Sequence, residues 1–160
     1  MTENKISYTC SFFGHKSIKE TDELKEKLYQ TIIDLIINES VDTFLFGSNS
    51  SFDKVCLQTV TAIKEKYPYI KRIYVRAEFP YINNEYRAYL LESYDDTYYP
   101  EKLVGAGRAA YVERNCEMIN NSQFCVVYYD EKYAPATRKS GTKIALDYAM
   151  KRKKNIIIID

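Results

Sequence analysis

The sequence predicts an α/β protein in which helices cover both faces of a mostly parallel, five-stranded sheet. Apolar, strand-like runs alternate with amphipathic, helix-like segments along the 160 residues, and parallel strands require helical crossovers of this kind. Three of the apolar runs also lead into a loop of small or polar residues that opens a helix-like segment. These loops are Phe13-Gly14-His15-Lys16, Phe46-Gly47-Ser48-Asn49-Ser50-Ser51-Phe52-Asp53 and Ser140-Gly141-Thr142-Lys143.

The first predicted unit is a strand followed by a helix. Residues 5–13 form a β-rich run that stops at Gly14. The helix is expected to start near Ser17, because Ser17 and Glu20 have the spacing of a capping box. Its apolar residues recur at helical intervals and are Leu24, Leu28, Ile32, Leu35 and Ile36.

The same pattern is repeated in the next segment. Residues 41–46 predict a second strand, which ends before Gly47. Val55, Val60 and Ile63 then form the apolar stripe of a second helix that ends near Tyr67-Pro68. A third strand is expected at residues 72–77.

The segment 78–107 predicts no clear element, because tyrosines crowd there among acidic and polar residues. It can serve as a lid whose rings stack on a base, as a dimer face or as ordinary packing. After it the sequence predicts a helix at 109–120, a buried strand at 124–129, a loop at 130–140, a helix at 142–152 and a last strand at 156–159.

The predicted strand order is 3-2-1-4-5, because crossovers between parallel strands are right-handed. In this order the direction of winding reverses between strands 1 and 4, and open α/β sheets bind ligands at such a point. We expect the loops at Gly14 and Gly141 to flank this crevice, with the loop at Gly47 beside them.

Composition narrows the choice of function. The 23 basic and 22 acidic residues give a net charge of +1, which supplies no broad positive surface for nucleic acid or an anionic membrane, so neither is expected as a partner. No apolar run is long enough to cross a bilayer, and the four cysteines lack the spacing of a metal site. We expect a single cytoplasmic domain over residues 1–160, without metal or cofactor, whose Cys10 and Cys125 pack as small hydrophobes.

The third loop predicts an anion site. Gly141 and Thr142 open a helix, where N–H groups without intrahelical partners and a partial positive charge attract a phosphate. Further positive charge is available from neighbouring basic residues and from the first loop. The residues considered for this role are Arg138, Lys139, Lys143, Lys16 and His15.

Two polar residues admit more than one role. His15 is the only histidine; it can act as a general base, although a lone loop histidine is more commonly a polar surface residue. Asp53 stands at the start of the second helix, where it can be the N-cap or accept hydrogen bonds from ribose hydroxyls.

Together the three loops and the segment Tyr111-Val112-Glu113-Arg114-Asn115-Cys116-Glu117-Met118 resemble the SLOG superfamily, and most of all its YpsA-like branch. The resemblance implies a three-layer, Rossmann-like domain that binds a nucleotide or nucleotide-derived small molecule, such as one of the ADP-ribose type, and that pairs as a homodimer. The sequence departs from the family pattern at Ser48 and Ser51, where glycine or alanine is usual, and at Ser140, which takes the place of the first glycine of Gly-Gly-Thr. The ligand-binding residues implied are Gly14, His15, Lys16, Gly47, Ser48, Asn49, Ser51, Asp53, Arg114, Asn115, Ser140, Gly141, Thr142 and Lys143.

Glu113 and Arg114 resemble the Glu-Arg pair of the superfamily's phosphoribohydrolases, which cleave an N-glycosidic bond. Those enzymes also use a glutamate three residues after the threonine of their Gly-Thr motif, and Ala145 stands at that position here. We therefore rank three hypotheses: a binding module for a phosphorylated nucleotide derivative, then a nucleotide glycosidase with Glu113 and Arg114 as catalytic residues, then a single-stranded DNA binder.

Overall fold

The computed structural model describes residues 8–133 and 140–160 and contains a six-stranded sheet in the order β4-β3-β2-β1-β5-β6. Every neighbouring pair of strands is parallel. The strands are β1 (Tyr8–Gly14), β2 (Val41–Phe46), β3 (Lys71–Val75), β4 (Asp96–Tyr98), β5 (Phe124–Tyr128) and β6 (Asn155–Ile159). The α-helices are α1 (Asp22–Asn38), α2 (Ser51–Lys64), α3 (Asn84–Leu90), α4 (Ala110–Asn120) and α5 (Gly141–Lys151).

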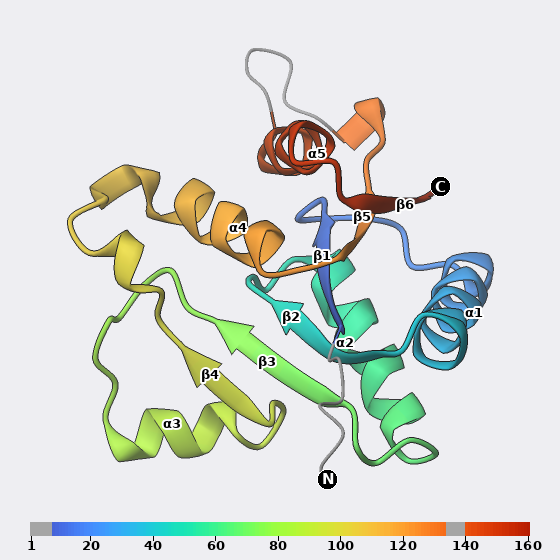
Figure 1. Cartoon of the computed structure of the whole chain (residues 1–160), viewed down its shortest axis with the longest axis horizontal. Coiled ribbons are helices and arrows are strands. Elements are labelled where there is room, and N and C mark those ends of the chain that lie inside the picture. Colours follow the sequence, from blue (N-terminus) through green and yellow to red (C-terminus); the bar gives the residue numbers. More distant parts are fainter. Residues whose placement is uncertain (1–7, 134–139) are drawn as a thin grey trace, which may run out of the picture.

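Helices cover both faces of the sheet, which makes the fold a three-layer, Rossmann-like one (Figure 1). Successive residues of a strand point to opposite faces, and β1 follows this rule closely. Phe12 packs in the core under α1 and α2, whereas Phe13 packs in the core under α4 and α5. The side chain of Cys10 is buried on the first face and that of Cys125 on the second, as predicted for small hydrophobes.

The five predicted strands are present in the predicted order, but the prediction missed β4 at the sheet edge. This strand has three residues and carries only one buried side chain, Thr97, so it has no apolar pattern to detect. Side chains fix it instead: Thr97 Oγ1 donates to the carbonyl of Tyr74 at 2.8 Å, and Asp95 forms an ion pair with Arg72 at 3.1 Å. The preceding α3 also comes from this tyrosine-rich segment.

The predicted start of the first helix was wrong. Thr21, not Ser17, is the N-cap of α1, and its Oγ1 accepts a hydrogen bond from the Leu24 N–H at 3.1 Å. Asp22 and Glu23 then place acidic side chains in the first turn, next to the positive end of the helix dipole. The capping-box spacing of Ser17 and Glu20 was therefore coincidental.

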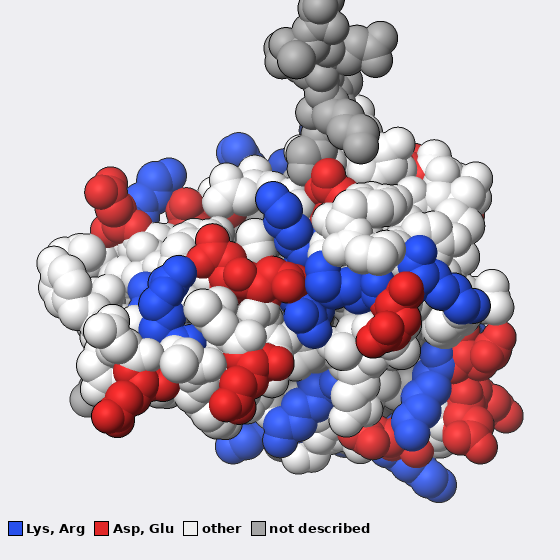
Figure 2. Space-filling view, turned by 90° about the horizontal axis from the view of Figure 1, so that it is seen from below, with Lys and Arg blue, Asp and Glu red and all other residues white. Residues whose placement is uncertain are grey.

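The distribution of charged side chains on the surface agrees with the net charge of +1. The face seen in Figure 2 carries Lys and Arg side chains interspersed with Asp and Glu side chains. Within residues 8–133 and 140–160, no helix combines the length and the apolar character needed to span a bilayer.

Candidate functional site

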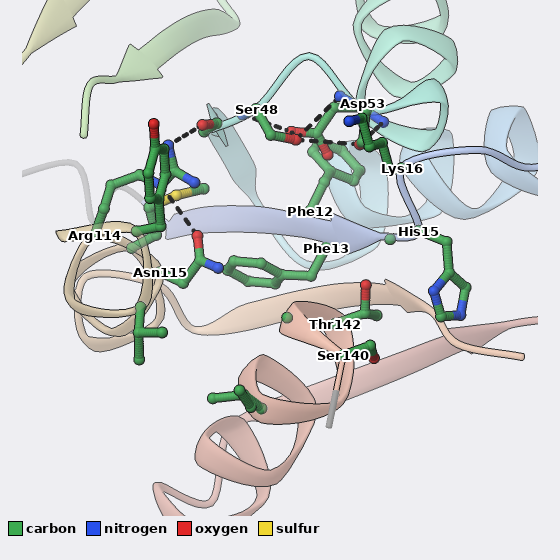
Figure 3. A pocket seen from close by; sticks show the side chains of 18 of the residues that line it. Phe12, Phe13, His15, Lys16, Ser48, Asp53, Arg114, Asn115, Ser140 and Thr142 are labelled. Atoms are coloured by element: carbon green, nitrogen blue, oxygen red, sulfur yellow. Dashed lines mark hydrogen bonds between the residues drawn. The ribbon is translucent and has the colours of Figure 1, made fainter. Parts of the chain in front are cut away.

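A cavity of about 770 Å³ lies at the carboxyl ends of the central strands, where the three predicted loops meet. Figure 3 shows Ser48 and Asp53 on one side of β1 and Ser140 and Thr142 on the other, with His15 at the end of the strand. The predicted residues that line the cavity are Gly14, His15, Lys16, Gly47, Ser48, Asn49, Asp53, Arg114, Asn115, Ser140, Gly141 and Thr142. The parallel sheet thus brings together segments that are about a hundred residues apart in sequence.

Three of the predicted residues do not line this cavity, namely Ser51, Lys143 and Glu113. Ser51 has a structural contact instead, because its N–H donates to the Lys16 carbonyl at 2.8 Å and joins the first loop to the second. Glu113 is exposed, whereas the neighbouring Arg114 is buried, so the two do not face the cavity as a pair. Arg138 and Lys139 lie outside the described residues.

The second loop closes the N-terminus of α2 with its own side chains. Ser50 is the N-cap, and its Oγ accepts a hydrogen bond from the Asp53 N–H at 3.1 Å. The Asp53 carboxylate reaches back and accepts hydrogen bonds from the N–H and the hydroxyl of Ser48, at 3.0 and 2.9 Å. The interpretation of Asp53 as the N-cap was therefore wrong. The residue instead stands at the third helical position, and its carboxylate binds Ser48, two residues before the N-cap.

Asp53 is buried, and this burial raises the pKa of its carboxyl group from 3.8 to about 6. The hydrogen bonds from Ser48 and the positive charge of Arg114 oppose the rise by favouring the carboxylate. At neutral pH the group is therefore mostly ionised and places a negative charge at the cavity wall.

The third loop leaves the N-terminus of α5 open. Ser140 is the N-cap, with its Oγ accepting a hydrogen bond from the Lys143 N–H at 3.0 Å. No acidic residue occurs in the first turn. A Cβ atom added to Gly141 would meet nothing within 4 Å in the described structure, and Gly141 and Thr142 line the cavity, so the start of the helix faces open space.

Arg114 connects α4 to the second loop from inside the cavity wall. Its Nη1 donates to the Gly47 carbonyl, and its Nε donates to Asn115 Oδ1 at 3.1 Å (Figure 3). The guanidinium also lies 5.6 Å from the centre of the Tyr111 ring. Burial lowers the pKa of Arg114 from its ordinary value, but a guanidinium stays charged at neutral pH.

Gly47 is required by this arrangement, because a Cβ atom there would lie 2.8 Å from Arg114 Nε and 2.7 Å from Met118 Sδ.

The family model described as the YspA SLOG family matches residues 7–160 of the chain. The chain belongs to this family. Membership of a SLOG family suggests a nucleotide-related function. A search of curated proteins finds no match.

Two of the three departures from the SLOG pattern have a visible structural role. The hydroxyl of Ser48 donates to Asp53, and the hydroxyl of Ser140 caps α5. For Ser51 the structure shows only a backbone hydrogen bond, which any residue other than proline can make. The hydroxyls of Ser48 and Ser140 therefore form hydrogen bonds at the starts of α2 and α5, on the wall of the cavity.

His15 differs from its prediction in burial and in charge. Only 5% of the side chain is exposed, and its Nε2 accepts a hydrogen bond from the Asp130 N–H at 2.9 Å. Burial lowers the pKa of the imidazole below its ordinary value of 6.5, so the ring is neutral at pH 7. It therefore supplies no positive charge, and it is not a surface residue; it joins the end of β1 to the segment after β5.

Lys143 is likewise engaged elsewhere. Its Nζ donates to Asp147 Oδ1 at 2.9 Å, one turn further along α5, and lies 5.8 Å from the centre of the Tyr129 ring. Of the predicted basic residues that the structure describes, Lys16 lines the cavity and is exposed.

The sequence interpretation missed part of the cavity wall. Glu78 lines it from the segment after β3, and an apolar surface is supplied by Phe12, Phe13, Val112, Met118 and Ile144. The position of Glu78 just beyond a parallel strand was a usable signal, because residues at carboxyl ends of such strands face the ligand crevice. Among residues 8–133 and 140–160, no group of three or more His, Cys, Asp or Glu side chains is placed to hold a metal ion.

Proposed function

We propose that the cavity binds a phosphorylated nucleotide or a nucleotide-derived small molecule and that the phosphate sits on the N-terminus of α5. The observation that carries the proposal is the open helix start at Gly141, where no side chain of the described residues lies within 4 Å of an added Cβ atom and no carboxylate occupies the first turn. Helix N-termini of this kind bind anions through their N–H groups and their dipole. The Thr142 side chain lines the same space and adds a hydroxyl donor.

The charge distribution orients the ligand. Asp53 is ionised at neutral pH and repels a phosphate from the side of α2. Carboxylates readily accept hydrogen bonds from hydroxyl groups, so the sugar of the ligand belongs near Asp53 and Ser48. The phosphate and the sugar then lie on the two sides of β1, as the two loops do (Figure 3).

The size and lining of the cavity suit a nucleotide. A volume of about 770 Å³ is within the range of pockets that hold cofactor-sized molecules. Apolar side chains such as Val112 and Ile144, together with the Tyr111 ring, form a wall against which a base can pack. An ADP-ribose-type ligand fits these properties as well as a mononucleotide does.

The proposal is tested by thermal unfolding in the presence of AMP, ADP-ribose, cyclic ADP-ribose, NAD, a single-stranded oligonucleotide and, as the uncharged control, adenosine. A ligand at 100 times its Kd stabilises the folded state by about 2.7 kcal/mol, which raises Tm by roughly 5–10 °C for a domain of this size. We expect at least one phosphorylated compound to do so and adenosine not to. Equal shifts with adenosine, or no shift with any nucleotide, would contradict a phosphate site.

Chromatography of the same mixtures separates binding from catalysis. Unchanged ligand supports a binding module, whereas release of free base would add glycosidase activity. Glu113 is exposed and outside the cavity, so Glu113→Gln is expected to change neither result. A shift with the oligonucleotide alone would favour the DNA-binding hypothesis instead.

A further inference from the structure

A second, smaller cavity of about 210 Å³ adjoins the first one and shares part of its wall. The residues that line both cavities are Gly47, Ser48, Asn49, Glu78, Tyr111 and Arg114. The smaller cavity extends from this shared wall toward the segment after β3, where Arg76 and Ala77 line it. One ligand that occupied both cavities would lie along these shared residues.

Arg76 is the feature that sets this smaller cavity apart. Arg76 is only 9% exposed, and its Nε and Nη1 atoms are buried. Within the part of the chain that the structure describes, neither atom has a hydrogen-bond partner. The backbone of Arg76 is fixed, because its N–H donates to the Tyr98 carbonyl at 2.9 Å.

A guanidinium with two buried nitrogens that lack hydrogen-bond partners is unfavourable in a folded protein. Arginine stays protonated at all ordinary pH values and presents five N–H donors, so it cannot escape the cost of burial by losing its charge. The electrostatic neighbours include Arg87, whose like charge adds to the cost, and Tyr86. Glu78 is the carboxylate among the lining residues, but it is exposed and makes no hydrogen bond to Arg76.

A second charged guanidinium lies on the wall that the two cavities share. Arg114 is held there by its hydrogen bonds to Gly47 and Asn115, so its position is fixed before any ligand arrives. The charged residues that line the smaller cavity are Arg76, Arg114 and the exposed Glu78, so its wall carries a net positive charge that attracts an anion.

We infer that the smaller cavity is a second anion subsite, in which Arg76 binds a phosphate or carboxylate group on the part of the ligand that lies away from α5. This inference rests on the proposed function, because it assigns two anionic groups to the same ligand. The ligand class that it selects is a nucleotide derivative with two separated negative groups, rather than a simple nucleoside monophosphate.

The test is a titration of the full chain with inorganic phosphate, followed by NMR at two reporters. The Gly141 backbone amide reports on the helix start, and the Ala77 backbone amide reports on the smaller cavity. Wild type is expected to show saturable shifts at both amides, together with a shift of the Arg76 Nε–Hε resonance. A wild-type protein in which neither Ala77 nor the Arg76 side chain responds would overturn the inference.

Arg76→Met tests whether the guanidinium is responsible. This variant is expected to weaken phosphate binding at Ala77 by more than tenfold, while the midpoint at Gly141 stays within threefold of wild type. Arg87→Met is the matched control, because it removes the same charge from a nearby, exposed arginine that pairs with Asp96 at 3.5 Å; both responses should persist. An unchanged Ala77 response in Arg76→Met would contradict the inference.

The two reporters keep the two proposals apart. A response at Ala77 without one at Gly141 contradicts the phosphate site on α5, whereas a response at Gly141 alone contradicts the second subsite. If Arg76→Met fails to fold, the Arg76 Nε–Hε resonance of the wild-type protein decides the question by itself.

Discussion

The N-termini of α2 and α5 open onto the same cavity, yet one is closed by the protein and the other is left open. Both begin with a serine N-cap whose hydroxyl accepts a hydrogen bond from the N–H three residues later. At that third position α2 has Asp53 and α5 has Lys143. Helix α2 therefore carries its own anion at its N-terminus, whereas α5 can bind one from solution.

The first residue of each helix shows the same contrast between a closed α2 and an open α5. In α2 it is Ser51, whose N–H is already bonded to the Lys16 carbonyl. In α5 it is Gly141, which has open space above it. Two helix starts with the same cap thus have opposite electrostatic roles, and this difference assigns the phosphate to one side of β1 and the hydroxyl groups to the other.

The largest expected effect follows from giving α5 the carboxylate that α2 already has. Gly141→Asp places a negative charge where the phosphate is proposed to sit, and like charges in contact cost several kcal/mol. We expect the affinity for the panel ligand with the largest melting shift to fall on the order of 1000-fold, or about 4 kcal/mol, as measured by calorimetry.

Gly141→Asn is the control for this substitution, because it has nearly the same shape without the charge. Its affinity should fall much less than that of Gly141→Asp. Neither variant should lower Tm, since an added Cβ meets no atom within 4 Å and an acidic side chain favours a helix N-terminus. Equal losses in the two variants would mean that steric blocking, not charge, decides binding there.

A second test removes the carboxylate from α2. Burial raises the pKa of Asp53 from 3.8 to about 6, so the folded protein holds this proton more tightly than the unfolded chain does. The contribution of Asp53 to stability therefore falls as pH rises from about 4 to 6, and above pH 6 its cost is on the order of 3 kcal/mol. Asp53→Asn lacks this cost, and we expect its Tm to exceed that of wild type by roughly 6–12 °C at pH 7.5.

The pH dependence makes this test specific. Below about pH 4 the carboxyl is protonated in both the folded and unfolded states, so the advantage of Asp53→Asn should disappear there. Thermal melts of both proteins between pH 3.5 and 8 measure it. An advantage that does not change with pH would show that better packing or hydrogen bonding, rather than the buried charge, is responsible.

Alanine substitutions of Gly14 in the first loop and Gly141 in the third loop are expected to differ in their effect on the free energy of unfolding. A Cβ atom on Gly14 would lie 2.3 Å from the Phe52 ring, which is completely buried at the start of α2. Gly14→Ala is therefore expected to lower the free energy of unfolding by about 1–3 kcal/mol. Gly141→Ala should leave it unchanged or slightly higher, because alanine favours the helix. Urea denaturation of both variants measures the difference, and a comparable loss in Gly141→Ala would contradict an open helix start.

Sequence reasoning identified the arrangement of strands and the loops that meet, because both follow from period-2 and helical apolar patterns and from the parallel topology. It missed β4, whose pairing depends on polar contacts such as Thr97 with Tyr74. It also could not tell which of two adjacent side chains would be buried, as with Glu113 and Arg114.

The roles of polar residues were the least predictable part of the site. His15 was expected to be exposed or charged, but the Asp130 N–H reaches it from a segment 115 residues away and the ring is buried. Arg76 gave no signal beyond its place after a strand, since only the packing of the described residues around it shows that its buried Nε and Nη1 have no hydrogen-bond partner. Such long-range contacts are not encoded in any local pattern.

The smallest expected effect concerns Lys143, which holds the same position in α5 as Asp53 holds in α2. Lys143 is next to the proposed phosphate site in sequence, but its Nζ bonds to Asp147 at 2.9 Å and the residue does not line the cavity. Lys143→Gln should therefore lower ligand affinity by less than threefold in calorimetry. Asp147→Asn, which frees the ammonium group, serves as the companion variant and should change affinity no more. A loss of tenfold or more in Lys143→Gln would mean that the lysine leaves Asp147 to contact the ligand, and the positive charge on α5 would then come from a side chain as well as from the helix itself.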